Sequence, residues 1–124
     1  MNIRSLTVFA AALLIGAAAI AAPVKQGQSS LGAVLTDAKG MTLYTFDKDA
    51  PGTSSCVDAC AQNWPPLMAA SGAMAEGDYT VIKRADGSMQ WAYKGKPLYT
   101  WSKDAKPGDT TGEGFKDIWH AARP

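Results

Sequence analysis

The sequence predicts a small, mainly β domain in which two pseudo-symmetric antiparallel β units, a hairpin and a meander, pack on each other. Three observations support this fold class. The segment GMTLYTFDKDA at 40–50 returns as GKPLYTWSKDA at 95–105. Runs of β-branched and aromatic residues surround both copies, and turns that contain Gly and Asp separate these runs. Only one short segment, around 56–63, carries the signals that begin and end a helix.

The repetition extends beyond the copied segment. Tyr44 and Tyr99 are 99 − 44 = 55 residues apart, and Trp64 and Trp119 are again 119 − 64 = 55 residues apart. A fixed spacing of this kind indicates an internal duplication. Because a single hairpin is only marginally stable in water, neither copy should be stable alone. We therefore expect the two copies to pack around a pseudo-twofold axis.

The first 21 residues have the features of a secretory signal peptide. Arg4 precedes an apolar run that is too short to span a bilayer, and small residues surround the predicted cleavage site after Ala21. No cysteine stands at that site, so we expect no lipid anchor and no stable membrane insertion after cleavage. The mature protein is expected in the periplasm or outside the cell.

The rest of the chain is expected to form one domain behind a short leader. Residues 22–30 lack apolar periodicity, which predicts a flexible leader. A single duplicated β domain follows over 31–124, with repeat units at about 31–67 and 79–120. The Gly- and Ala-rich segment 69–77 is the expected boundary between the units.

Turn signals divide each unit into strands. In the first unit, the tetrapeptide DAKG at 37–40 separates two β-rich runs and predicts a hairpin of 31–36 and 41–46. In the second unit, two turns separate three such runs. This pattern predicts an antiparallel meander with strands at 79–83, 89–93 and 98–101.

The predicted helix around 56–63 holds the only two cysteines of the chain, Cys56 and Cys60. Ser55 can cap its first turn, and Pro65 cannot continue it. In an exported protein, two cysteines favour a disulfide. Residues four apart on a helix hold their Cβ atoms about 5–6 Å apart, which is too far for a disulfide, so Cys56 should lie outside the helix or the segment should be tightened. A redox-active pair is the alternative, although its spacing differs from the C-x-x-C motif of thiol oxidoreductases.

Charge and motif content narrow the function classes. Without Arg4 the chain carries 12 − 1 = 11 basic and 11 acidic side chains, which gives no electrostatic footprint for nucleic acid. No nucleophile–base motif, phosphate loop or paired catalytic carboxylate is recognisable in the sequence. We therefore expect neither a nucleic-acid partner nor enzymatic activity.

The copied segment carries the candidate site residues. In a strand its two aromatic residues point to one face, and an aspartate follows past the strand end in each copy. One interpretation is structural: the rings fill the core, the phenol makes a buried hydrogen bond and the carboxylate sets the turn. The other is a small concave binding site that occurs twice. The candidate residues are Tyr44, Phe46, Asp49, Tyr99, Trp101 and Asp104.

The pattern Tyr-x-(Phe/Tyr/Trp)-x-x-Asp stands at 44–49 and again at 99–104. Together with the segment CVDACAQNWPPL at 56–67 and the PGD-to-Trp119 tail, it resembles the bacterial secreted-repeat family with this motif, whose members are often described as predicted lipoproteins of unknown function. The resemblance covers nearly the whole mature chain. It implies a fold family and an exported location, but no activity. The missing lipidation cysteine distinguishes this chain from the lipoprotein description.

Three further residues, Trp64, Trp119 and His120, are secondary candidates. Zinc would need more nitrogen and sulfur donors than the two cysteines and His120, the single histidine, provide. Copper(I) could use methionines together with the thiolates, but methionines fill cores far more often than they bind metal. We expect no cofactor, and copper is the alternative.

The leading functional hypothesis is an exported, non-catalytic binding or envelope-interaction module with an unknown envelope or extracellular partner. A periplasmic redox or copper-handling protein that uses Cys56 and Cys60 is the second hypothesis.

Overall fold

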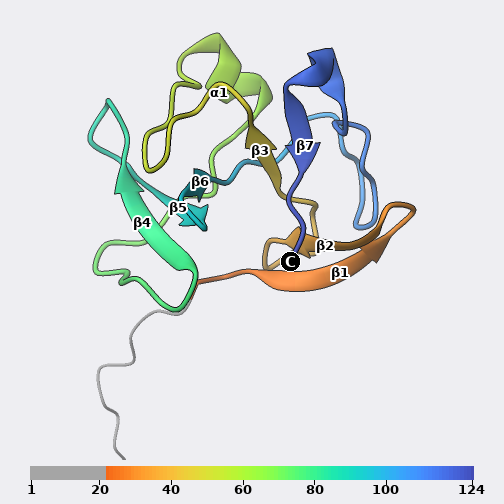
Figure 1. The fold of residues 1–124 in the computed structure, drawn as a ribbon, viewed down its shortest axis with the longest axis horizontal. Coiled ribbons are helices and arrows are strands. Elements are labelled where there is room, and N and C mark those ends of the chain that lie inside the picture. The colour runs from red at the N-terminus through yellow and green to blue at the C-terminus, as the bar shows by residue number, and fades with distance from the viewer. Residues whose placement is uncertain (1–21) are drawn as a thin grey trace, which may run out of the picture.

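The computed structural model describes residues 22–124 (Figure 1), and the predicted signal peptide over 1–21 lies outside them. The described chain is mainly β, as the sequence predicts. No helix in this part of the chain is long and apolar enough to cross a membrane. Its elements are, in order, β1 (Lys25–Ser29), β2 (Gly32–Thr36), β3 (Tyr44–Phe46), α1 (Ala59–Asn63), β4 (Tyr79–Lys83), β5 (Met89–Tyr93), β6 (Lys96–Pro97), the 3-10 helix η1 (Phe115–Asp117) and β7 (Trp119–Ala121).

The first unit begins earlier than the sequence indicates. Residues 25–29 form β1, which pairs antiparallel with β2 over five residues, where a flexible leader over 22–30 is expected. Apolar periodicity misses this strand because its side chains are polar and largely exposed. Gly27 fits here because a Cβ at this position would lie 2.7 Å from Thr36 Cγ2.

The predicted hairpin around 37–40 is present, but its second strand divides. The turn closes with hydrogen bonds from Gly40 N–H to Asp37 and from Leu43 N–H to Leu35. From Tyr44 onward the chain leaves β2 and pairs with β7, as β3. The first unit is therefore also a meander, in which β1, β2 and residues 41–43 follow one another.

The second unit is the expected meander, with β4, β5 and β6 in adjacent positions. Its third strand is Lys96–Pro97 and not the predicted 98–101. Leu98 still donates its N–H to Trp91, but Tyr99 bridges Tyr44 and Pro66. The predicted strand is thus divided between its own sheet and the contact with the first unit. Figure 1 shows the β4–β5–β6 sheet at the left of the view and the β1–β2 hairpin at the lower right, with β3 and β7 above the hairpin.

Tyr44 and Tyr99 mark a pseudo-twofold axis between the units. These equivalent residues bond to each other reciprocally: Tyr44 N–H donates to the Tyr99 carbonyl at 2.7 Å, and Tyr99 N–H donates to the Tyr44 carbonyl at 3.0 Å. Backbone bonds on either side come in pairs related by the 55-residue shift. Written as donor and acceptor, they are Asp47–Ile118 with Ser102–Asn63, and Ala122–Leu43 with Leu67–Leu98.

The helix is shorter than predicted. It spans Ala59–Asn63, with Asp58 at the N-cap and no side-chain cap bond, so Ser55 does not cap it. The Ser55 hydroxyl instead contacts Asp49 and the Lys48 carbonyl. Cys56 consequently lies outside the helix, one of the two arrangements that the disulfide geometry allows.

Two clusters of apolar side chains form the core. One gathers most of the aromatic residues of the repeated segments around Tyr44, Tyr99 and Trp64. The other lies beneath the two meanders, around Leu43, Leu98 and Trp91. Residues of both repeats contribute to both clusters, so neither unit has a core of its own.

Candidate functional site

The tyrosine of each repeat binds the aspartate of the other repeat. The Tyr44 hydroxyl donates to Asp104 Oδ2 at 2.6 Å, and the Tyr99 hydroxyl donates to Asp49 Oδ2 at 2.6 Å. Both tyrosines are fully buried. The repeated motif therefore joins the two units through a pair of exchanged hydrogen bonds.

The other carboxylate oxygen of each aspartate holds the turn that follows it in the same repeat. Asp104 Oδ1 accepts bonds from the N–H and the hydroxyl of Thr111, at 3.0 and 2.6 Å. Asp49 Oδ1 accepts the same two bonds from Ser55, at 2.7 and 2.9 Å. Each carboxylate thus links a turn of its own repeat to a buried phenol of the other repeat.

Burial and the neighbouring aspartates raise the pKa of both phenols far above that of free tyrosine. Burial, which removes the water that would solvate the ionised hydroxyl, is the largest cause for Tyr44, and the hydrogen bond to Asp104 adds to it. The same order holds for Tyr99 and Asp49. Both hydroxyls stay protonated as hydrogen-bond donors, which suits a structural link between the repeats.

Four aromatic rings form a continuous stack across the axis. Trp119 and Trp64 lie parallel at its centre, with ring centroids 3.8 Å apart. Phe46 stacks on the outer face of Trp119 at 4.2 Å, and Trp101 stacks on the outer face of Trp64 at 3.9 Å. Since Phe46 and Trp101 are equivalent residues, the stack is itself pseudo-symmetric. The three tryptophans are buried, so these rings serve chiefly as core.

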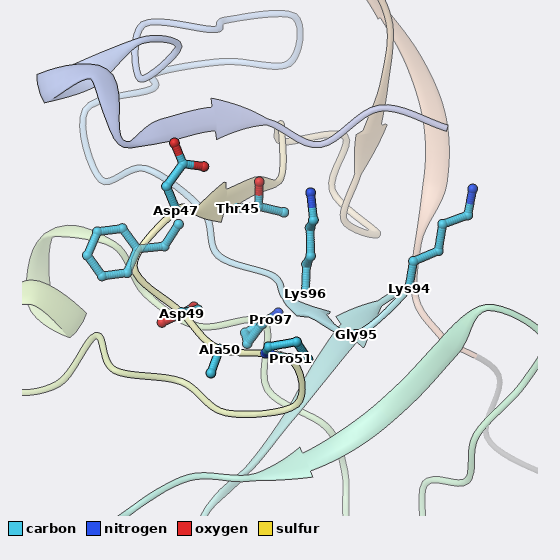
Figure 2. A pocket seen from close by; sticks show the side chains of 10 residues that line it. Thr45, Asp47, Asp49, Ala50, Pro51, Lys94, Gly95, Lys96 and Pro97 are labelled. Atoms are coloured by element: carbon cyan, nitrogen blue, oxygen red, sulfur yellow. The ribbon is translucent and has the colours of Figure 1, made fainter.

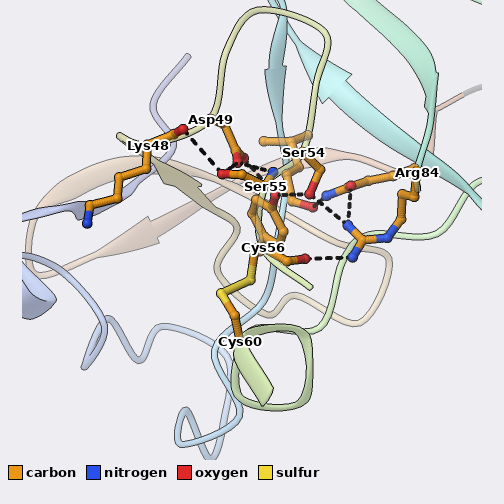
Figure 3. The surroundings of a disulfide bond; sticks show 10 residues. Lys48, Asp49, Ser54, Ser55, Cys56, Cys60 and Arg84 are labelled. Carbon is orange, nitrogen blue, oxygen red and sulfur yellow. Dashed lines mark hydrogen bonds between the residues drawn. A yellow bond between two sulfur atoms is a disulfide. The ribbon is translucent and has the colours of Figure 1, made fainter. Parts of the chain in front are cut away.

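The two cysteines form a disulfide at the edge of the aromatic core (Figure 3). Cys56 is fully buried, and Cys60 packs against the same cluster at the start of α1. The buried Arg84 holds this loop in place: its Nη2 donates to the Cys56 carbonyl at 2.7 Å. Arg84 Nη1 donates to Gln90 Oε1 at 2.8 Å, so the guanidinium is satisfied by neutral acceptors.

A hydrogen-bonded chain connects Arg84 to the Tyr99–Asp49 pair. Arg84 Nη1 donates to Ser54 Oγ at 2.9 Å, and Ser54 Oγ lies 2.6 Å from the Tyr99 hydroxyl. Because the Tyr99 proton points to Asp49, Ser54 is the donor to Tyr99. The guanidinium charge thus faces the Asp49 carboxylate through two hydroxyls, a feature of the first repeat's turn that the Tyr44–Asp104 pair does not share.

His120 is held between carboxylates from both repeats. Its Nε2 lies 3.0 Å from Asp47 Oδ2, and its Nδ1 lies 3.1 Å from Glu113 Oε2. The Glu113 contact, followed by that with Asp47, raises the pKa of His120 above its ordinary value, although partial burial opposes the change. In turn, partial burial works to raise the pKa of Glu113, but the Ala121 N–H and His120 outweigh it and the pKa is lowered.

A cleft opens beside β3, between the turn at 49–51 and the β5–β6 connection (Figure 2). Its volume is about 260 Å³, and Phe46, Ala50 and Pro51 provide its accessible apolar surface. A second cavity of about 350 Å³ continues it toward β7 and the C-terminus. The two cavities have Thr45, Asp47, Lys94 and Lys96 in common and together form what we call the β3–β7 cleft.

The β3–β7 cleft is lined by three cations, Lys94, Lys96 and Arg123. None of them has a carboxylate oxygen of residues 22–124 within 4 Å. Figure 2 shows Lys96 extending from β6 past Thr45 toward β7. Of the two acids in the cleft, Asp47 contacts His120 and Asp49 is bonded to Tyr99 and Ser55.

A family model described as a secreted repeat of unknown function matches the chain twice, at residues 25–68 and 80–123. The chain belongs to this family. The first match begins at Lys25, the first residue of β1, so the family repeat includes the strand that sequence periodicity misses. Searches of curated proteins and of solved structures found no significant match.

Within this secreted-repeat fold, the sequence-predicted site residues separate into two groups. Phe46 and Asp49 reach the surface of the β3–β7 cleft, and His120 lines its extension. The other candidates, Tyr44, Tyr99, Trp101, Asp104, Trp64 and Trp119, are buried in the contact between the repeats. Among residues 22–124, no group of three or more His, Cys, Asp or Glu side chains is arranged to hold a metal ion.

Sequence reasoning misses the cations of the cleft. Lys94 and Lys96 follow β5, whereas Arg123 follows β7, and no motif connects them. Comparison of the repeats offers one signal: with the 55-residue shift, Lys96 and Arg123 stand where the first repeat has Met41 and Met68. The substitution of charge for apolar side chains at equivalent positions would have indicated this surface.

Proposed function

We propose that this protein is an exported, non-catalytic binding module and that its ligand occupies the β3–β7 cleft. One observation carries the proposal: the repeated aromatic residues and aspartates are used in the contact between the units, whereas the cleft beside them is open and lined by cations that form no ion pair within residues 22–124. Its mixture of apolar surface and a few charged groups is typical of small-molecule sites.

The export part of the proposal is supported by the family, which is described as secreted. The chemistry of the cleft supports the non-catalytic part of the proposal. Its histidine, His120, contacts two carboxylates, and no cysteine or serine lines either cavity. Thr45 lines both cavities, but the two ring nitrogens of His120 contact Glu113 and Asp47 and neither contacts Thr45, so His120 is not paired with a hydroxyl nucleophile. An envelope or extracellular partner would present its ligand group to this cleft.

A fragment titration followed by amide chemical shifts tests the site. The mature protein, labelled with ¹⁵N, is titrated with neutral, cationic and anionic aromatic fragments of similar size. We expect saturable shifts confined to amides around the cleft, such as Asp47, Gly95 and Lys96. Saturable shifts that gather at another surface, or no saturable shift with any fragment, would contradict the proposal.

The redox or copper hypothesis is a separate proposal. It requires the Cys56–Cys60 bond to open, because both sulfur atoms are joined to each other. The buried position of Cys56 limits the access of a partner to its sulfur. The cysteine variants in the Discussion test this hypothesis.

A further inference from the structure

The duplication supplies an internal comparison for the β3–β7 cleft. Each residue around the cleft has an equivalent on the opposite side of the pseudo-twofold axis. The backbone bond from Ala122 to Leu43 matches the bond from Leu67 to Leu98 after the 55-residue shift. The segments around Ala122 and Leu67 are therefore equivalent in the two halves. The turns before residues 96 and 41 also correspond, since Gly95 and Gly40 both have positive φ, at 83° and 85°. A Cβ added at either glycine would meet a turn proline, Pro51 at 3.9 Å or Pro107 at 3.3 Å.

The two equivalent surfaces differ in charge. On the cleft side, the relevant positions are occupied by Lys94, Lys96, His120 and Arg123. On the opposite side, the 55-residue shift places Lys39, Met41, Pro65 and Met68 at the same positions. Two permanent cations and a histidine thus stand where the other half has two methionines and a proline. Since the opposite half keeps an equivalent backbone without these charges, the repeat fold does not require them at these positions.

The two acids of the cleft, Asp47 and Asp49, form no ion pair with these cations. The Asp47 carboxylate is 3.0 Å from His120 Nε2, and Asp49 accepts bonds at both of its oxygens. Lys94, Lys96 and Arg123 are exposed and have no carboxylate partner among residues 22–124. Lys94 instead lies above the Tyr93 ring, with Nζ 5.2 Å from the centroid. The site therefore offers N–H donors and positive charge beside an apolar wall.

We propose that the β3–β7 cleft binds a small organic anion, a carboxylate or a phosphate monoester, with its charged group at Lys94, Lys96 and Arg123 and its apolar part against Phe46, Ala50 and Pro51. This inference rests on the proposed function, because it names the ligand class of the same cleft. Lysine and arginine form charge-assisted hydrogen bonds with both kinds of anion. The cavity volumes of about 260 and 350 Å³ suit a ligand the size of a substituted aromatic acid.

Four probes test the ligand class on the mature protein by chemical-shift titration: benzoate, phenyl phosphate, phenol and inorganic phosphate. The two aromatic anions carry both features of the predicted ligand, phenol carries only the ring, and inorganic phosphate carries only the charge. We expect one of the aromatic anions to bind at least ten-fold more tightly than phenol and than inorganic phosphate. The preferred anion distinguishes a carboxylate ligand from a phosphate ligand.

Two matched triple variants test whether anion binding requires the positive charges of the cleft. The cleft variant carries Lys94→Gln, Lys96→Gln and Arg123→Gln. The control variant carries Lys39→Gln, Lys83→Gln and Lys103→Gln, which remove the same charge from exposed positions outside the β3–β7 cleft. We expect the cleft variant to lose at least ten-fold in affinity for the aromatic anion and the control to change by less than two-fold.

Each negative result has a separate meaning. If phenol shifts the cleft amides as strongly as the aromatic anions do, the cleft is a binding site but the anion inference is wrong. Equal losses in the two triple variants would also overturn the inference, because they would show an unspecific charge effect. If no fragment of any charge produces saturable shifts at the cleft, the proposed function fails together with the inference.

Discussion

The hydroxyl of Tyr44 donates to Asp104 across the pseudo-twofold axis, at 2.6 Å, so the tyrosine of the first repeat binds the aspartate of the second. The same hydroxyl accepts the N–H of Gly112 at 3.2 Å. Tyr44 therefore satisfies two buried groups of the second repeat while its ring packs against Trp64. An arrangement of this kind explains why each repeat carries both a tyrosine and an aspartate although neither repeat uses its own pair.

The first prediction concerns this exchanged bond. Tyr44→Phe should lower the free energy of unfolding by about 1–3 kcal/mol, because it leaves Asp104 Oδ2 and the Gly112 N–H without their partner in a buried site. Tyr99→Phe should have a similar effect through Asp49. Urea unfolding followed by tryptophan fluorescence measures both changes.

Tyr93→Phe is the control for these variants, since the Tyr93 hydroxyl forms no hydrogen bond with residues 22–124 and should cost little. Binding of the aromatic anion should survive the Tyr44 change, because Tyr44 does not line the β3–β7 cleft. If Tyr44→Phe abolished anion binding while the protein remained as stable as the native form, the motif would be a binding site and not a structural link.

Sequence reasoning predicts much of this fold because the duplication and the turn signals are local features. The hairpin around 37–40 and strands β4 and β5 appear as expected. It does not predict that Tyr44 bonds to Asp104, because the strand period places the Tyr44 side chain on a face but cannot say which repeat supplies its partner. It likewise misses β1, whose polar side chains carry no apolar pattern.

The candidate site, like the fold, is only partly predictable from the sequence. The aromatic residues and aspartates are recognisable because they recur, and recurrence in this chain marks the contact between the units. The β3–β7 cleft depends on what differs between the repeats, such as Arg123 in place of Met68. Lys96 and Arg123 come together only because β6 and β7 both lie next to β3, and this adjacency is a tertiary feature.

The second prediction concerns the disulfide. Cys56→Ala combined with Cys60→Ala should lower the free energy of unfolding by about 2 kcal/mol, the chain-entropy value for a five-residue loop. We expect the native fold and anion binding to remain, since the bond lies outside the β3–β7 cleft. Urea unfolding measures the stability. Alkylation of the native protein with and without reductant measures thiol access.

Free alkylation of both thiols in protein taken from its exporting compartment would contradict the structural role of the disulfide. So would a cysteine variant with native stability that has lost its biological activity. Either result would indicate that Cys56 and Cys60 form the functional site.

The third prediction concerns Gly112, which lies against the aromatic core. A Cβ at this position would come within 2.7 Å of Trp64 Cη2 and 3.0 Å of Tyr44 Cε2. Gly112→Ala should therefore displace the ring stack and cost about 1–3 kcal/mol. Near-ultraviolet circular dichroism should show an altered tryptophan signal in the folded variant.

Gly114→Ala provides a contrast, because it has open space around it but a φ of 76°. This variant should lose about 1 kcal/mol from backbone strain and keep the native tryptophan signal. An unchanged spectrum in both variants would show that the stack does not depend on close approach at Gly112.

The fourth prediction concerns the pH dependence of the His120 contacts. The pKa of His120 is raised in the folded protein by Glu113 and Asp47, so its stabilising contribution is complete below the unfolded pKa of about 6.5 and is lost as the pH rises through the folded pKa. The pKa of Glu113 is lowered, so its contribution is present above its unfolded value and is lost as the pH falls through the folded value. Together the contacts stabilise most in mildly acidic solution, with an effect below about 1 kcal/mol because the side chains are partly exposed.

Histidine ring resonances followed over a pH titration should give a folded pKa above that of a free histidine, and Asp47→Asn should bring it down part of the way. His120→Gln should remove the difference in stability between about pH 6 and pH 8.5 that the native protein shows, while Lys83→Gln, an exposed change on β4, should leave that difference in place. Because Asp47 comes from the first repeat and both His120 and Glu113 from the second, loss of the proton from His120 weakens a contact between the repeats next to the β3–β7 cleft. A His120 resonance that titrates at the value of a free histidine would contradict this account of the contact.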